Sequence, residues 1–245
     1  MVAGLDEPIH HRIGTLDFFF IDVEEKKLPQ LTTLSFVQGC YRVHGEKLEP
    51  LDISGQYTLP DDFVFGSKYK GKTNERLSQL LLNVGLAALG QDPNKKLKIL
   101  DPMCGRGTTL WWAARYGINA KGIEQDPKAL EEIRRHLKKW TKLHRIKHQL
   151  KEGSIGAAKK KNVGKFIDIT LPESTLKVTI GDSRDAPELL KGESFDLLIA
   201  DLPYGVQHFT TSKTRNPLAV VQEALPGWAQ CLKESGAIVL SFNSS

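Results

Sequence analysis

The sequence predicts an α/β fold in which a mostly parallel sheet is covered by helices on both faces. Two observations carry this prediction. From residue 97 onward, short apolar runs alternate with longer segments of helical periodicity, which is typical of βαβ units. One run, residues 197–200, is apolar throughout, and the absence of alternation favours a strand that is buried on both faces.

The length of 245 residues fits one full α/β domain and an accessory segment. We expect a small β-rich accessory region in residues 1–65 and the α/β domain in residues 66–245. No apolar run approaches the ~20 residues of a membrane-spanning helix, and the N-terminus lacks the apolar core of a signal peptide, so no membrane partner is expected. The three cysteines are far apart, which predicts a reducing compartment, the cytoplasm, with the nucleus as the alternative.

The elements follow from local patterns. In the accessory region, three apolar or β-branched runs predict strands at residues 18–21, 31–37 and 41–43. Residues 74–89 predict a helix that ends at Gly90, and the apolar side chains at helical spacing predict its buried face: Leu77, Leu80, Leu81, Val84 and Ala88. The later elements are predicted as strand 97–100, helix 108–116, strand 120–123, helix 127–150, basic loop 153–165, strand 176–180, short helix 187–190, strand 197–201, helix 218–232 and strand 237–242.

A glycine-containing stretch, residues 101–109, lies between a predicted strand and a predicted helix. Gly105 and Gly107 allow a tight turn and the close approach of a ligand, and a helix that begins at Thr108 offers free N–H groups to a carboxylate. Glu124 follows the next strand, 17 positions after Gly107, where an acid accepts hydrogen bonds from a ribose diol in dinucleotide-type folds. Asp182 follows the third strand and is placed to accept from an adenine amino group.

The fourth strand ends in Asp201, Leu202, Pro203 and Tyr204, where ligands bind in open α/β sheets. An exocyclic amino group is a poor nucleophile because its lone pair is delocalised, and two hydrogen-bond acceptors can localise that pair. The Asp201 carboxylate and the Leu202 carbonyl can be these acceptors. Pro203 fixes the backbone dihedral φ, and Tyr204 offers a flat face on which a base can stack.

This stretch resembles the (Asp/Asn)-Pro-Pro-(Tyr/Phe) motif of S-adenosylmethionine-dependent amino-methyltransferases, with Leu202 in place of the first proline. The run Asp-Pro-x-Cys-Gly-x-Gly, from Asp101 to Gly107, is similar to the first motif of the same enzymes. Together the two are most similar to the catalytic domain of the tRNA guanine-N2 methyltransferases that often carry a THUMP domain. The resemblance covers residues 69–245, and the roughly 65 residues before it are too few for a THUMP domain.

The resemblance implies a class I methyltransferase fold, a Rossmann-like three-layer sandwich, and S-adenosylmethionine as the cofactor. The sheet of such enzymes adds a terminal antiparallel strand pair, which is not evident here, so the chain is a shortened form or N-terminal strands complete the sheet. A small zinc-binding activator protein is a further implied partner. The resemblance and the patterns together assign these residues, with no metal ligands: Asp101, Cys104, Gly105, Gly107, Thr108, Glu124, Asp182 and Thr73 to the cofactor, and Asp201, Pro203 and Tyr204 to catalysis.

Positive charge is concentrated in one segment. From Arg134 to Lys165 the chain has twelve Lys or Arg residues and one acid, Glu152, a net charge of +11 in a chain whose total is +5. Such a stripe is typical of proteins that bind a polyanion. We therefore expect RNA, with tRNA first, to bind this segment; the alternative is a solvated helix face with a lysine-rich loop.

Three other functions fit parts of the sequence. Residues 66–73 match a P-loop, with residues 63–65 as its preceding strand, which would indicate an NTPase. A non-catalytic RNA-binding module would fit if the cofactor site were degenerate. Amino-methyltransferases of DNA and of protein glutamine share the motifs described above. A methyltransferase of base carbons would need a cysteine nucleophile near the fourth strand, and Cys231 lies in a later predicted helix.

Overall fold

The computed structural model describes residues 7–53, 57–68, 72–90, 96–155, 163–202 and 217–242. The chain divides into two compact units, Met1–Gln56 and Tyr57–Ser245, and each unit is described by itself. Within the described residues, no helix combines the length and the apolarity that a membrane crossing requires.

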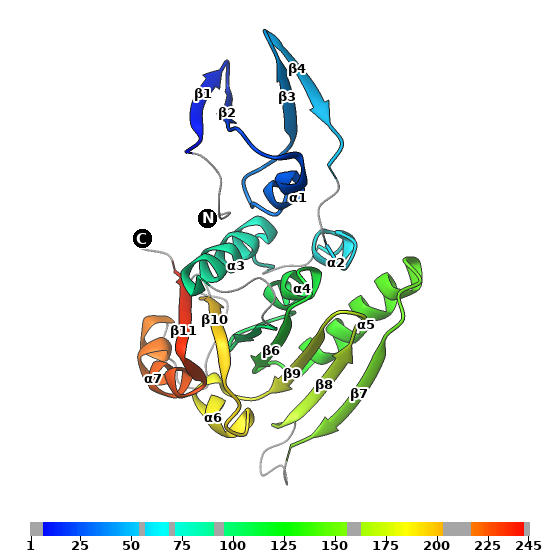
Figure 1. Ribbon diagram of the computed structural model, residues 1–245. Helices are drawn as coiled ribbons and strands as arrows, with labels where there is room; N and C mark the ends of the chain where they lie inside the picture. Colours follow the sequence, from blue (N-terminus) through cyan, green and yellow to red (C-terminus); the bar gives the residue numbers. More distant parts are fainter. Residues whose placement is uncertain are drawn as a thin grey trace. The chain divides into compact units, whose positions relative to one another are not determined.

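The first unit contains two separate β-hairpins (Figure 1). Their elements are β1 (Ile9–Ile13), β2 (Leu16–Phe20), the 3-10 helix η1 (Glu25–Lys27), α1 (Leu28–Leu31), β3 (Cys40–His44) and β4 (Lys47–Leu51). The predicted runs 18–21 and 41–43 fall on β2 and β3. The strand predicted at residues 31–37 is wrong, because α1 ends there and turns follow. Each hairpin forms a two-stranded sheet of its own, so neither completes the larger sheet.

The second unit is built on a seven-stranded sheet with the strand order β11-β10-β5-β6-β9-β8-β7. The strands are β5 (Lys98–Asp101), β6 (Asn119–Glu124), β7 (Gln149–Ser154), β8 (Lys165–Thr170), β9 (Thr175–Ile180), β10 (Phe195–Asp201) and β11 (Leu232–Ser241). The first five in this order run parallel, and β8 and β7 are antiparallel to their neighbours. The predicted mostly parallel sheet is confirmed.

Helices cover both faces of this sheet, which makes three layers (Figure 1). They are α2 (Asp62–Phe65), α3 (Glu75–Leu89), α4 (Thr108–Arg115), α5 (Lys128–Leu143), η2 (Ser183–Asp185), α6 (Ala186–Leu189) and α7 (Pro217–Gln230). Successive side chains of β10 face opposite layers: Leu197 and Ile199 join the core that includes α3, α4 and α5, whereas Leu198 and Ala200 join the core that includes α6 and α7. A strand buried in this way has no polar alternation.

Two unpredicted strands, β7 and β8, form the antiparallel edge of the sheet. The helix predicted over residues 127–150 ends at Leu143, and β7 begins within the predicted end of that helix. The helix stops because Arg145 adopts a left-handed φ of 54° and the Ile146 N–H bonds to the Thr141 carbonyl at 2.9 Å, a helix-ending arrangement. At the other edge of the sheet, β11 pairs with β10 alone among the described strands.

The predicted boundary after residue 65 differs from the division between Gln56 and Tyr57. The residues in between belong to the second unit because their apolar side chains complete its core. Leu59, Phe63 and Val64 are buried there, and the Arg115 side chain donates to the Leu59 carbonyl at 3.0 Å.

The helix predicted over residues 74–89 is present, and Asn74 caps it by accepting from the N–H groups of Arg76 and Leu77. Its buried face is rotated from the predicted one. Leu80 and Val84 are 43% and 49% exposed, whereas the residues that face the core are Ser78, Gln79, Leu81, Leu82 and Gly85. The rotation follows from polar contacts that periodicity cannot reveal, since the buried Gln79 amide donates to the hydroxyl groups of Tyr57 and Tyr116.

Candidate active site

Carboxylates gather at the carboxyl ends of the parallel strands. Asp101, Glu124 and Asp201 are the last residues of β5, β6 and β10, and parallel strands share one carboxyl edge. Both Glu124 and Asp201 act electrostatically on Asp101, which places the three carboxylates close together. The structure therefore brings together residues that are far apart in the sequence.

The loop after β5 is shaped by its glycines. Gly105 and Gly107 have φ angles of +53° and +84°, a region that side chains with a Cβ rarely adopt. The Gly107 N–H bonds to the Cys104 carbonyl at 2.7 Å and closes the turn. A Cβ on Gly105 would meet no atom within 4 Å, so the space above this residue is open to a ligand. Gly107 is the N-cap of α4, whose first N–H groups favour an anion.

Glu124 ties this loop to the end of β6. One carboxylate oxygen, Oε2, accepts from the Gly105 N–H at 2.8 Å, and the other, Oε1, accepts from the Asp126 N–H at 2.8 Å. An ionised carboxylate has about four acceptor positions. Each oxygen of Glu124 can therefore still accept one further hydrogen bond, as the two hydroxyl groups of a ribose would require.

Asp101 is almost completely buried. The pKa of its carboxyl group is raised to about 7, by burial first and then by the charges of Asp201 and Glu124, against the hydrogen bonds from the Met103 N–H and the Thr109 side chain. The ionised form is therefore short of a positive partner. A cationic ligand would supply one, which is the fit expected for the ammonium and sulfonium groups of S-adenosylmethionine.

Three other residues predicted to bind the cofactor, Cys104, Thr108 and Thr73, lie in different surroundings from one another. Cys104 is buried, and its Sγ atom lies where a Cβ on Gly122 of β6 would come within 2.5 Å of it. Its side chain thus packs the loop onto the sheet. Thr108 is buried at the start of α4. Thr73 is partly buried before α3, and none of the hydrogen bonds seen among the described residues joins it to the strand ends.

Asp182 follows β9, as predicted. Its carboxylate accepts hydrogen bonds from Arg184, a residue that the sequence analysis does not identify. The Arg184 backbone N–H and Nε–H donate to its Oδ1 atom, both at 3.0 Å, and Arg184 Nη2 donates to Oδ2 at 2.7 Å. The Gln125 side chain is a fourth donor. These bonds, those from the Arg184 side chain first, hold the pKa of Asp182 below its usual value. Arg184 also contacts Glu223 of α7 at 2.8 Å.

The end of β10 is described only in part. The Leu202 N–H bonds to the Ser241 carbonyl of β11 at 2.9 Å, so the chain stays within the sheet up to that residue. The predicted catalytic residues Pro203 and Tyr204 lie outside the described residues, as do the three lysines 159–161 of the basic segment. No cluster of three or more metal-ligating side chains is seen in the described ranges.

The P-loop interpretation is wrong in its first element. Residues 63–65 belong to the helix α2, and they are not the strand that a P-loop follows. The Lys72 ammonium group, which would bind a phosphate in a P-loop, binds protein groups here. It donates to the carbonyls of Val64 and Ser67 at 2.6 and 2.7 Å and pairs with Glu75. It thereby caps the C-terminal end of α2.

Comparison with known proteins identifies the family. The model of the RMKL-like methyltransferase domain matches residues 68–245, which is most of the chain. The chain belongs to this family. It is an S-adenosylmethionine-dependent methyltransferase with the class I Rossmann-like fold. No curated protein sequence matches it significantly.

Solved structures are similar to this methyltransferase at low sequence identity. The rRNA methyltransferase aviRa from Streptomyces viridochromogenes is 18% identical, with a TM-score of 0.49, over 74% of this chain and 80% of that one. The precorrin 8W decarboxylase of Methanobacterium thermoautotrophicum is 20% identical, with a TM-score of 0.42, over 75% and 71%. TrmN from Thermus thermophilus is 18% identical, with a TM-score of 0.44, and the chain covers 39% of its length.

Proposed function

We propose that the methyltransferase modifies an exocyclic amino group of RNA, with guanine N2 of tRNA as the target. The observation that carries the proposal is the position of Asp201. Its carboxylate ends β10, beside Asp101 and at the edge where the glycine loop and Glu124 meet. An acceptor in this position can bind the amino group that receives the methyl group.

The residues of the site then have separate tasks. The bound cofactor supplies an electrophilic methyl group. Glu124 would accept from the ribose hydroxyls, Asp182 would accept from the adenine amino group after one of its four donors leaves, and the start of α4 would hold the carboxylate of the methionine part. Asp101 would offer its carboxylate to the cationic part of the cofactor. The Asp201 carboxylate and the Leu202 carbonyl accept both N–H groups of the target amine, and Tyr204 stacks on its base.

The Asp201 carboxylate acts most strongly as the reaction proceeds. The attacking nitrogen gains positive charge in the transition state, so its N–H groups become better donors to an anion. The proton that nitrogen loses afterwards needs an acceptor, and Asp201 is the carboxylate placed beside it in this proposal.

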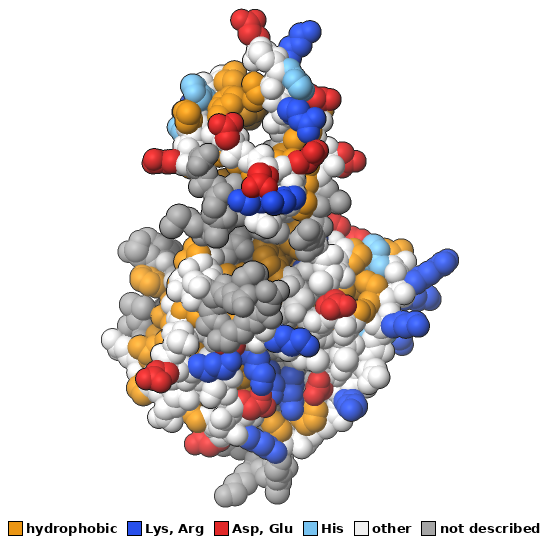
Figure 2. Space-filling view, viewed as in Figure 1, with side chains coloured by type: hydrophobic (Ala, Val, Ile, Leu, Met, Phe, Trp, Pro, Cys, Tyr) orange, Lys and Arg blue, Asp and Glu red, His pale blue; other side chains and the backbone are white. Residues whose placement is uncertain are grey.

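Charge supports RNA as the substrate class. The predicted isoelectric point is 9.0, and the helix α5 carries several of the basic residues of the segment from Arg134 to Lys165. Figure 2 shows Lys and Arg side chains at the edge of the molecule formed by α5 and β7. Part of this charge is compensated, because Arg134 pairs with Glu152 and Arg135 pairs with Glu131. The lysines of α5 remain to attract phosphates.

One experiment tests the substrate class and the reaction together. The purified protein is incubated with S-adenosylmethionine carrying a labelled methyl group and, separately, with tRNA, ribosomal RNA, DNA and a protein fraction. We expect label in tRNA, and N2-methylguanosine after digestion to nucleosides. Label in DNA or in protein glutamine alone would overturn the proposal while leaving the enzyme an amino-methyltransferase.

A further inference from the structure

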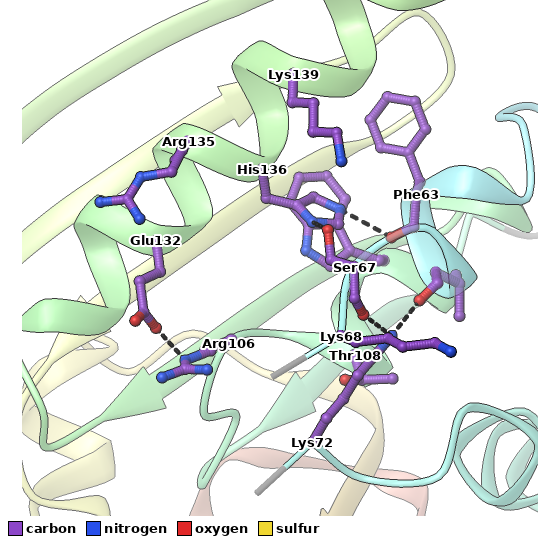
Figure 3. Close-up of a pocket in the computed structure, with 12 residues that line it drawn as sticks. Phe63, Ser67, Lys68, Lys72, Arg106, Thr108, Glu132, Arg135, His136 and Lys139 are labelled. Carbon is purple, nitrogen blue, oxygen red and sulfur yellow. Dashed lines mark hydrogen bonds and ion pairs between the residues drawn. The ribbon is translucent and has the colours of Figure 1, made fainter. Parts of the chain in front are cut away.

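A cavity of about 280 Å³ lies between the end of α2, the start of α4 and one side of α5 (Figure 3). Five cationic side chains line it: Lys68, Lys72, Arg106, Arg135 and Lys139. The single carboxylate among its described lining residues is that of Glu132. We call it the cationic cavity. Its Arg106 stands between Gly105 and Gly107, so the cavity adjoins the cofactor loop.

The carboxylates near the cationic cavity already have partners. Glu132 pairs with Arg106 (Figure 3), and Glu75 pairs with Lys72. Lys139 and Lys68 have no ion pair with any described residue. The Lys139 ammonium group lies 4.0 Å from the centre of the Trp140 ring. The described residues therefore leave the cavity with an excess of positive charge.

One wall of the cationic cavity is rigid and uncharged. Burial lowers the pKa of His136 to about 4, so this side chain is neutral near pH 7. Its Nε2 atom lies 2.9 Å from the Phe63 carbonyl, and its Nδ1 atom lies 3.1 Å from the Ser67 hydroxyl. The Phe63 carbonyl requires a proton on Nε2, and the neutral ring then has none on Nδ1, which accepts from the Ser67 hydroxyl. The ring also lies 4.8 Å from that of Trp111, and the wall is thus fixed from several sides.

We propose that the cationic cavity binds a backbone phosphate of the RNA strand whose base enters the methyl-transfer site. A cleft lined by one sign of charge concentrates ions of the opposite sign, and Lys and Arg are the usual partners of phosphate oxygens. The volume is below the ~300–1,000 Å³ typical of pockets for whole small molecules, and it suits a phosphate group with its sugar. This inference rests on the proposed function, because it assumes that RNA is the substrate.

Position is the second argument for an RNA phosphate. Arg106 and Thr108 line the cavity, while the glycines on either side of Arg106 form the cofactor loop. A phosphate in the cavity would therefore lie beside the turn that carries the cofactor loop. Such a contact would fix the register of the strand, as phosphate contacts do in general, so that one nucleotide is presented to Asp201.

Two neighbouring lysines of α5 provide a matched test. Lys139 lines the cavity, whereas Lys138 is an exposed residue of the same helix outside the lining. The full chain is titrated against a fluorescein-labelled, single-stranded oligoribonucleotide of mixed sequence, and anisotropy is measured at several salt concentrations. We expect Lys139→Glu to weaken binding at least about fivefold, and to reduce the slope of log affinity against log salt by about 0.7, the value for one phosphate contact on a single strand.

The controls separate the possible failures. Lys138→Glu should change affinity less than about twofold, Lys139→Arg should bind as the unchanged protein does, and all variants should bind S-adenosylhomocysteine equally well. If the two glutamate variants weaken RNA binding equally, the cavity is no special site and the inference is overturned, although RNA remains the substrate. If Lys139→Glu lowers affinity for S-adenosylhomocysteine instead, the cavity belongs to the cofactor. If the unchanged protein binds no oligoribonucleotide even at low salt, the proposed function fails as well.

Discussion

The turn at residues 101–107 separates two regions of opposite charge. On one side are the carboxylates of Asp101, Glu124 and Asp201, at the ends of parallel strands. On the other side is the cationic cavity between α2, α4 and α5. The difference matches the two kinds of ligand that the proposed reaction needs, since the cofactor is cationic near its methyl group and RNA is a polyanion. If the proposal holds, each region attracts its own ligand and disfavours the other.

The largest expected effect comes from the carboxylate that we assign to the substrate amine. Asp201→Ala should lower the rate of methyl transfer by at least ~100-fold, the scale found when a preorganised electrostatic partner is removed. Affinity for S-adenosylhomocysteine, measured by calorimetry, should stay nearly unchanged. Asp201→Asn keeps an acceptor oxygen without the charge and should retain more activity than Asp201→Ala. Near-normal turnover by the alanine variant would exclude the assignment of this residue to catalysis.

The next effect tests the division between the two regions directly. Glu124→Ala should weaken binding of S-adenosylhomocysteine by about 1 to 3 kcal/mol, because a charged acceptor and the anchor of the Gly105 N–H are both lost. Glu132→Ala is the matched control. It removes a carboxylate from the cationic side of the same turn, and calorimetry should show little change. Equal losses in both variants would mean that the turn does not separate two sites.

The strand ends could be predicted from the sequence because each is marked locally, by a short predicted strand that ends at an acid. Asp101, Glu124 and Asp201 then come together because parallel strands share one edge. The end of α5 could not be predicted in this way. Residues 144–150 continue the polar pattern of the helix, and the helix stops through a left-handed Arg145, a conformation that arginine does not signal.

Tertiary contacts account for most of what the sequence did not show. The cationic cavity joins α2, α4 and α5, which are far apart in the chain, and α2 was assigned to another region. Arg184 was missed although its spacing from Asp182 was visible. An Arg two residues after an acid carries no strong signal, and the four donors to Asp182 depend on the turn of η2.

Arg184, which binds Asp182 at the end of β9, should have a smaller effect on cofactor affinity. The four donors fill the acceptor positions of Asp182, so an adenine amino group can bind there only after one of them leaves. Arg184→Ala removes two of the four and should raise affinity for S-adenosylhomocysteine by roughly threefold to tenfold, since the site no longer has to be cleared before binding. Glu223→Gln loosens the outer contact of Arg184 and should act in the same direction, but less. A loss of affinity in the arginine variant would show that Arg184 itself holds the cofactor.

The smallest expected effect is a dependence of ligand affinity and stability on pH, which comes from the carboxyl group of Asp101. Burial, together with the charges of Asp201 and Glu124, raises the pKa of this carboxyl group to about 7, so the group is mostly neutral below pH 7 and ionised above it. A cationic ligand favours the ionised form. Affinity for S-adenosylmethionine should therefore increase as the pH rises through about 7, and binding near that pH should release protons, which calorimetry in buffers of different ionisation enthalpy would detect.

Stability without ligand should change in the opposite direction: the folded chain keeps a proton that the unfolded chain loses above about pH 4, so the free energy of unfolding from this group falls as the pH rises towards 7. Asp101→Asn cannot titrate and should remove both dependences. If the asparagine variant kept the same rise in affinity with pH, another group of the acidic region would be responsible for it.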